Sequence, residues 1–191
     1  MTINDIVAIA NLSLVLDLRP QCLKDVEERQ MESNGRIEPI RYCNFLFLLT
    51  RLVQPLNIIE LGTLHGTSTA HLAYGYPRAH VFTVDMQEFE TDFLPGCYTP
   101  NIHRIKNDSL SGFTALFPQA EADIVFFDSE HSYAHSCAEY GTYKNLTRPG
   151  GILIFDDVDL SDEMKQFWSE IPEPKINLPL LHETGFGICF A

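Results

Sequence analysis

Three aspartates at the ends of apolar runs could hold a metal ion. Asp128 closes the run ADIVFFD (122–128), and Asp156 and Asp157 close the run GILIFDD (151–157). Neighbouring parallel strands would bring these carboxylates to one edge of a sheet, where they would repel one another and raise one another's pKa. A hard divalent cation such as Mg²⁺ removes this repulsion because it prefers oxygen ligands. The sequence therefore predicts a divalent-metal site at that edge.

The loop after an earlier apolar run, NIIEL (57–61), could bind a cofactor. It reads ELGTLHGTST (60–69), and glycines at a strand end let the backbone turn tightly and approach a ligand closely. Its spacing differs from the GxGxxG of dinucleotide-binding proteins, because Gly62 and Gly66 are four residues apart. Glu60 would also repel a phosphate. A cofactor that lacks phosphate and carries an amino acid group fits this loop better.

The string IIELGTLHGTST (58–69) resembles the first motif of the class I S-adenosylmethionine-dependent methyltransferases, in the form found in small O-methyltransferases. The resemblance extends over about residues 40–191, which is most of the chain. It implies that the acid and the glycines of the motif hold the methionine part of the cofactor. The residues implicated in this way are Glu60, Gly62, Thr63, Gly66 and Ser68.

Asp85 and the pair Asp108-Ser109 are the next candidates for cofactor binding. Asp85 ends the run VFTVD (81–85), and a carboxylate there could accept hydrogen bonds from both ribose hydroxyls. A solvated aspartate at a strand end is the alternative. The segment IKNDS (105–109) resembles the adenine-contacting segment of the family, which implicates Asp108 and Ser109. An Asp-Ser pair that opens a helix is also an ordinary N-cap, so a structural role is the alternative here.

The resemblance also concerns the metal site and a catalytic base. Metal-dependent O-methyltransferases of the catechol type and the macrolide-sugar type place metal-binding acids at positions that match Asp128, Asp156 and Asp157. Asp157 replaces the asparagine of the catechol type, as in the sugar-modifying enzymes. His131 lies where catechol-type enzymes carry a catalytic lysine, and a neutral imidazole could take the proton of an acceptor. A role beside the metal and a purely structural role are the alternatives for His131.

The elements that would position these residues alternate along the chain. Continuous apolar runs suit strands buried on both faces of a parallel sheet, and segments of helical length separate them. We predict helices in residues 1–33, 39–53, 68–74, 109–117, 133–146 and 161–171, and late strands in 175–181 and 185–190. The predicted fold is therefore α/β: a Rossmann-like, doubly wound, mostly parallel sheet with helices on both faces and an antiparallel last strand. One domain (1–191) is expected, with a helical cap (1–55) before a cofactor-binding core (56–191).

Charge and cysteine usage restrict the partners. The chain of 191 residues has 26 acidic and 13 basic residues, and its formal net charge is −13. This charge disfavours nucleic acid and anionic membranes as partners. The five cysteines form no CxxC pair, and no apolar run reaches the roughly 18 residues that span a bilayer. These features predict reduced thiols in a cytoplasmic protein, and the apolar segment 6–18 could pack against a second copy in a homodimer.

The combined prediction is a methyltransferase that uses S-adenosylmethionine and a divalent cation, such as Mg²⁺, to methylate an oxygen of a small hydroxylated metabolite. Asp128 and His131 are its predicted catalytic residues. Two other classes stay open: a non-catalytic binding or scaffold protein on a methyltransferase fold, and an NAD-dependent oxidoreductase, which the glycine spacing disfavours. The identity of the acceptor depends on the N-terminal helices and on the segment 86–100, whose sequence is too irregular to interpret.

Overall fold

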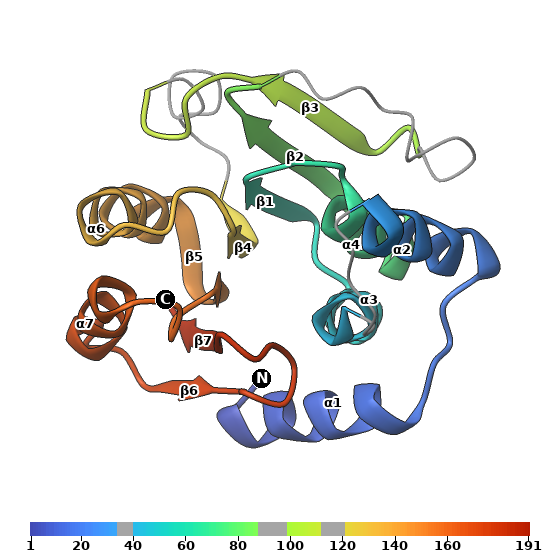
Figure 1. Cartoon of the computed structure of the whole chain (residues 1–191), viewed down its shortest axis with the longest axis horizontal. Coiled ribbons are helices and arrows are strands. Elements are labelled where there is room, and N and C mark those ends of the chain that lie inside the picture. The colour runs from blue at the N-terminus through green and yellow to red at the C-terminus, as the bar shows by residue number, and fades with distance from the viewer. Residues whose placement is uncertain (34–39, 88–98, 112–120) are drawn as a thin grey trace.

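The computed structural model describes residues 1–33, 40–87, 99–111 and 121–191. Within these residues a seven-stranded sheet has the strand order β3-β2-β1-β4-β5-β7-β6 (Figure 1). The strands are β1 (Asn57–Leu61), β2 (His80–Asp85), β3 (Ile102–Lys106), β4 (Ala122–Phe127), β5 (Thr147–Asp156), β6 (Lys175–Asn177) and β7 (Phe186–Phe190). The helices are α1 (Ile3–Val15), α2 (Gln21–Ser33), α3 (Arg41–Val53), α4 (Thr67–Gly75), α6 (Tyr133–Tyr143) and α7 (Asp162–Glu170), with a 3₁₀ turn over Lys144–Leu146.

The directions of the strands confirm the predicted fold. β1 runs parallel to β2 and β4, and the pairs β2–β3 and β4–β5 are also parallel. β7 runs antiparallel to both of its neighbours, β5 and β6. The sheet is therefore mostly parallel with an antiparallel last strand, and helices cover both of its faces (Figure 1).

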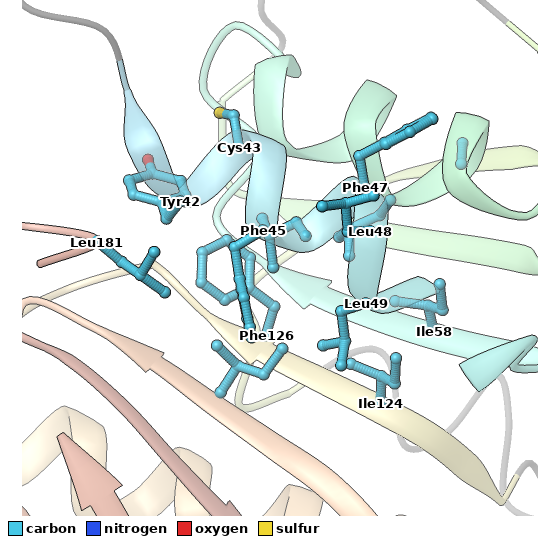
Figure 2. Close-up of a cluster of buried hydrophobic side chains, with 14 of the residues drawn as sticks. Tyr42, Cys43, Phe45, Phe47, Leu48, Leu49, Ile58, Ile124, Phe126 and Leu181 are labelled. Atoms are coloured by element: carbon cyan, nitrogen blue, oxygen red, sulfur yellow. The ribbon is translucent and has the colours of Figure 1, made fainter. Parts of the chain in front are cut away.

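One face of the sheet is covered by α1, α3 and α4 (Figure 1). Side chains of a strand alternate between faces, so Ile58 joins this layer while Ile59 points to the opposite one. Figure 2 shows Phe45 and Leu49 of α3 in this layer, together with Ile124 of β4. Burying one such side chain contributes about 1.5–3 kcal/mol. This packing fixes α3 against the strands whose ends carry the site.

The other face is covered by α6 and α7 (Figure 1). Phe155 of β5 stacks on Phe127 of β4, with ring centroids 4.4 Å apart and an interplanar angle of 10°. Phe167 and Trp168 of α7 approach Phe155 with centroids at 5.6 Å and 5.8 Å. α7 begins at the N-cap Ser161, whose side chain accepts a hydrogen bond from the Met164 N–H. The aromatic layer therefore holds β4 and β5 side by side just before their acidic ends.

Some elements differ from the sequence-based expectations. The strand β3 was not predicted, because this edge strand alternates between buried and exposed residues and has no continuous apolar run. Residues 109–111 form a turn, and the rest of the predicted helix 109–117 lies outside the described residues. The predicted helical segment 1–33 contains two helices, separated by residues 16–20; Pro20 directly precedes α2, where a missing N–H removes no hydrogen bond of the helix. In the described part of the chain, no helix has the length and apolarity needed to cross a membrane.

The strand order reverses between β1 and β4, which creates a binding crevice. The chain proceeds outward from β1 through β2 to β3 and then returns to β4 on the other side of β1. In open α/β sheets, ligands bind at this switch point, beyond the carboxyl ends of the strands. Leu61 pairs with both Val84 and Phe127, and Phe127 pairs with Phe155, so these strands end level with one another. The candidate residues that follow each strand therefore reach the same edge.

Candidate functional site

Two adjacent cavities open at this edge of the sheet. The larger measures about 580 Å³ and lies over the ends of β1, β2, β3 and β4. The smaller measures about 190 Å³ and lies between α2, α3 and α4 and the ends of β4 and β5. Leu64 and Asp128 line both cavities. A molecule in the larger cavity would therefore meet a molecule in the smaller one at Leu64 and Asp128.

The loop after β1 requires glycine at two of its positions. Gly62 has a φ of +92°, and a Cβ added there would lie 1.9 Å from the carbonyl oxygen of Asp128. Gly66, the N-cap of α4, has a φ of +75°. Both angles are in the left-handed region that side chains disfavour. The glycines of the predicted motif therefore act through the backbone. The absence of a side chain at Gly62 allows the loop after β1 to contact the loop after β4 directly.

Asp85 holds this loop in place through backbone hydrogen bonds. Its Oδ2 accepts the N–H groups of Thr63 at 2.9 Å and Leu64 at 3.1 Å, and its Oδ1 accepts the N–H of Gln87 at 2.9 Å. Asp85 also lines the larger cavity, where its sequence position predicts the ribose of the cofactor. A carboxylate has about four acceptor sites, so three backbone donors leave capacity for a ligand hydroxyl. Asp85 is therefore suited to shape the loop and to bind a ligand at once.

Glu60 and Thr63 are both buried. Glu60 is 0% exposed, and burial raises its pKa to about 7, although hydrogen bonds from neighbouring hydroxyls act in the opposite direction. Its Oε2 accepts a hydrogen bond from the Thr69 hydroxyl, while its Oε1 has no hydrogen-bond partner among the described residues. The Thr63 hydroxyl pairs with that of Thr83 at 2.6 Å. Of the predicted methionine-binding residues, Gly62 lines the larger cavity and Thr63 and Ser68 line the smaller one.

The far end of the larger cavity is organised by a buried glutamate, Glu139 of α6. Its carboxylate accepts hydrogen bonds from the hydroxyls of Ser109 at 2.5 Å and Ser129 at 2.7 Å. The Nε2 atom of His135 lies 3.0 Å from the same carboxylate. Asp108 also lines this cavity, and its Oδ1 accepts the Leu110 N–H at 2.8 Å. The predicted pair Asp108-Ser109 is thus placed at the cavity, in a turn.

The carboxylates of β4 and β5 gather at the smaller cavity. Asp156 is 3% exposed, and burial raises its pKa, while a hydrogen bond with His182 acts in the opposite direction. Ligand atoms of Asp156, Asp157 and His182 all lie within 4.8 Å of one another. Asp128 lines the same cavity but does not belong to this group. The structure therefore combines two of the three predicted metal ligands with a histidine.

His131 lies between the carboxylates of Asp128 and Asp157, two of the three predicted metal ligands. Its Nε2 is 3.8 Å from Asp128 Oδ1 and 3.6 Å from Asp157 Oδ2, and the His131 side chain is 23% exposed. This nitrogen is buried and makes no hydrogen bond to another described residue. A basic nitrogen in this position can exchange a proton with a ligand in the crevice.

The donor set at this edge fits a divalent cation. Buried Asp156 and its neighbour Asp157 place negative charge where water is largely excluded, which is costly without a compensating positive charge. Asp157 has a φ of +59°, a sparsely populated conformation for a residue other than glycine, and its Oδ1 lies 3.4 Å from His182 Nδ1. Oxygen and imidazole donors are both ordinary ligands of divalent metals.

Sequence reasoning missed two residues of the site. His182 precedes β7, between the two late strand candidates, and no motif surrounds it; only the sheet topology places it beside β5. Glu139 has a weak signal, because it lies four residues after His135 and hence on the same face of α6.

Comparison with known proteins identifies the family and the fold of the chain. A family model described as a methyltransferase domain matches residues 59–158, more than half of the chain. The O-methyltransferase from Bacillus cereus in complex with SAH is 20% identical, with 97% of each chain covered and a TM-score of 0.70. TomG, an O-methyltransferase from Streptomyces achromogenes involved in tomaymycin synthesis, in complex with SAM, is 20% identical, with 97% of this chain and 96% of that chain covered and a TM-score of 0.68.

The SAH-bound methyltransferase PaMTH1 from Podospora anserina is 13% identical over 98% of this chain and 95% of that chain, with a TM-score of 0.69. At these identities the solved structures establish a shared fold, while the family model covers the motif at Glu60–Gly66 and the acids at the ends of β4 and β5. The chain therefore belongs to the methyltransferase-domain family, and the predicted enzyme class, an S-adenosylmethionine-dependent methyltransferase, is confirmed.

Proposed function

We propose that this protein methylates a hydroxyl oxygen of a small polar molecule with the help of a divalent cation. The observation that carries this proposal is the meeting of the two cavities at Leu64 and Asp128. The larger cavity has the volume typical of small-molecule and cofactor sites, and the smaller one contains the carboxylates. The pair of cavities would bring a methyl donor and an acceptor face to face.

The larger cavity is the proposed site of S-adenosylmethionine, which supplies the methyl group from its positively charged sulfur. Asp85 would accept hydrogen bonds from the ribose hydroxyls beside the loop that it already holds. Ser109, fixed by Glu139, would lie at the adenine end. The glycine loop would contact the methionine part, with buried Glu60 beneath it. Such fixed positions favour catalysis by orientation rather than by covalent chemistry.

The smaller cavity is the proposed site of the acceptor. Its lining includes Gln30, Tyr42, Thr67 and the carboxylates, so it offers hydrogen-bonding groups to a hydroxylated molecule. A volume of about 190 Å³ suits a small acceptor, or the part of a larger acceptor that carries the hydroxyl. O-methyltransferases among the solved structures with this fold support oxygen as the methylated atom.

Asp128, Asp156 and Asp157 are the proposed holders of the divalent cation, which supplies positive charge that lowers the pKa of the acceptor hydroxyl. His131 would receive the proton that leaves this hydroxyl. Its Nε2 is buried at the crevice and forms no hydrogen bond with another described residue, so it could accept this proton. The adjacent Asp128 and Asp157 would stabilise the resulting imidazolium, since both lie within 4 Å of this nitrogen.

Transfer of a radiolabelled methyl group from S-adenosylmethionine to a panel of hydroxylated molecules tests the proposal. We expect turnover with at least one acceptor, its loss after treatment with EDTA, and its recovery when Mg²⁺ or Mn²⁺ is added back. Turnover that survives complete removal of the metal would refute the role of the cation. Tight cofactor binding without turnover on any acceptor would favour a non-catalytic binding protein.

A further inference from the structure

His182 lies beside the proposed cation site although it belongs to a distant part of the chain. It sits between β6 and β7, and its Nδ1 is 2.7 Å from Asp156 Oδ1 and 3.4 Å from Asp157 Oδ1. The side chain is 12% exposed and lines the smaller cavity together with both aspartates. One nitrogen therefore faces both carboxylates from inside the cavity.

The surroundings of His182 fix the ring in this position. Tyr42 of α3 contacts it in a T-shaped arrangement, with ring centroids 5.3 Å apart. The Thr184 hydroxyl hydrogen-bonds to Asp157 and lies 3.3 Å from His182 Nδ1. Gly185 has a φ of +87° and donates its N–H to the His182 carbonyl at 3.1 Å. The turn before β7 is thus shaped so that the imidazole meets the aspartates at the end of β5.

The distances agree with three ligands of one ion. Donor atoms bound to a cation at about 2.1 Å and at right angles to one another lie about 3.0 Å apart. The separations of His182 Nδ1 from the oxygens of Asp156 and Asp157 lie on either side of this value, at 2.7 Å and 3.4 Å. The shared approach therefore favours a role as a ligand.

We propose that His182 is itself a metal ligand through Nδ1, and that it makes the site prefer a first-row transition-metal ion over Mg²⁺. Imidazole is a good ligand for such ions, whereas Mg²⁺ prefers an all-oxygen set. This inference rests on the proposed function, because it assumes that Asp156 and Asp157 hold a cation. It goes further in naming the nitrogen ligand and the class of ion.

Pulsed electron paramagnetic resonance of the Mn²⁺-loaded protein, with S-adenosylhomocysteine present, tests this inference without an activity assay. We expect hyperfine coupling from one histidine nitrogen in the wild-type protein and its loss in His182→Asn. The amide oxygen of asparagine can replace the nitrogen as a hard ligand. In calorimetric titrations we therefore expect this variant to bind Mn²⁺ roughly 10- to 100-fold more weakly and to change its Mg²⁺ affinity by less than about threefold.

Two further variants identify the nitrogen. His80→Asn alters a histidine at the opposite end of β2, where His80 and His103 stack 5.2 Å apart and could bind metal adventitiously. It should leave the nitrogen coupling unchanged, as should His131→Gln. Coupling that disappears in either of these variants, and not in His182→Asn, would overturn the assignment. If His182→Asn fails to fold, a wild-type spectrum without nitrogen coupling would still refute the assignment, and loss of the coupling in His80→Asn or His131→Gln would overturn it.

The outcomes separate this inference from the proposed function. Mn²⁺ bound at one site without nitrogen coupling would refute the role of His182 and leave the cation proposal intact. The absence of any Mn²⁺ binding with S-adenosylhomocysteine present would refute both the cation and its ligand. Equal affinity of the wild-type protein for Mg²⁺ and Mn²⁺ would contradict the proposed preference.

Discussion

The two halves of the crevice are built in different ways. Around the larger cavity, the interactions involve mainly backbone groups. Gly62 allows two loops to come into contact, and the Asp85 carboxylate accepts hydrogen bonds from three backbone N–H groups. Around the smaller cavity, side chains from separate elements converge, namely the β5 aspartates and His182. In the proposed function, the first half is a preformed cofactor cradle and the second half is a charged reaction site. Variants on the two sides should therefore fail in different ways.

The largest effect is expected on the side-chain half, for Asp128→Ala. We expect methyl transfer to fall by at least about 10³-fold, because the variant removes a charged group from the reaction site. The affinity for S-adenosylhomocysteine should change by less than about threefold, since the backbone contact between Asp128 and Gly62 is kept. Initial rates and calorimetric titration measure the two quantities. The exposed Asp162 of α7 gives a matched control, and Asp162→Ala should keep normal rates. Unimpaired transfer in Asp128→Ala would remove Asp128 from the mechanism.

On the backbone half, Glu60 should impose a pH dependence on stability. Burial raises its pKa from 4.5 to about 7, so the folded protein binds more protons than the unfolded chain between these values. Its contribution to stability is fully present below about pH 4.5 and is lost as the pH rises to about 7. The total loss is on the order of 3 kcal/mol.

Glu60→Gln should remove this slope. Urea unfolding of the protein without cofactor should give similar free energies for both proteins near pH 4.5 and a more stable variant above pH 7. Parallel curves for the two proteins would show that Glu60 ionises normally in the folded protein.

The smallest effect is expected for Asp85→Asn, which tests whether the hydrogen bonds of Asp85 to the loop contribute to cofactor binding. The amide group would place its own N–H against at least one of the three N–H groups that the carboxylate accepts. We expect the affinity for S-adenosylhomocysteine to fall roughly 10-fold, with a loss of about 1–3 kcal/mol in stability. Asp108→Asn is the comparison, because Asp108 lines the same cavity but accepts one backbone N–H, from Leu110. If Asp108→Asn lost more affinity for S-adenosylhomocysteine than Asp85→Asn, the stronger contacts with the cofactor would lie at the adenine end of the cavity and not at the loop.

The contrast between the halves also explains what could be predicted from the sequence. The larger cavity depends on features that are local in the sequence. Gly62 and Gly66 follow one apolar run, and Asp85 ends the next, so each can be recognised within its own short segment. The four predicted buried strands were found for the same reason, since each is one apolar run. The edge strand β3 lacks such a run and was missed.

The reaction half depends on contacts between distant segments, which the sequence does not display. His182 reaches Asp156 only because β7 pairs antiparallel with β5 and brings the preceding turn to the end of that strand. Glu139 of α6 accepts hydrogen bonds from Ser109, which follows β3, and from Ser129, which follows β4, so it joins segments that are distant in the sequence. The predicted strand ends thus lie at one edge of the sheet, as expected, while the full set of side chains that gathers there required the fold. The predicted specificity segment 86–100 lies largely outside the described residues.

Calorimetric titration with S-adenosylhomocysteine, with and without Mg²⁺ or Mn²⁺, tests most directly whether a cofactor cradle and a cation site share this crevice. We expect micromolar binding of S-adenosylhomocysteine and a clear change in affinity or enthalpy when the cation is present, because the two cavities share Asp128. Absence of binding under every condition would contradict the account and would reduce the likeness to methyltransferases to one of fold.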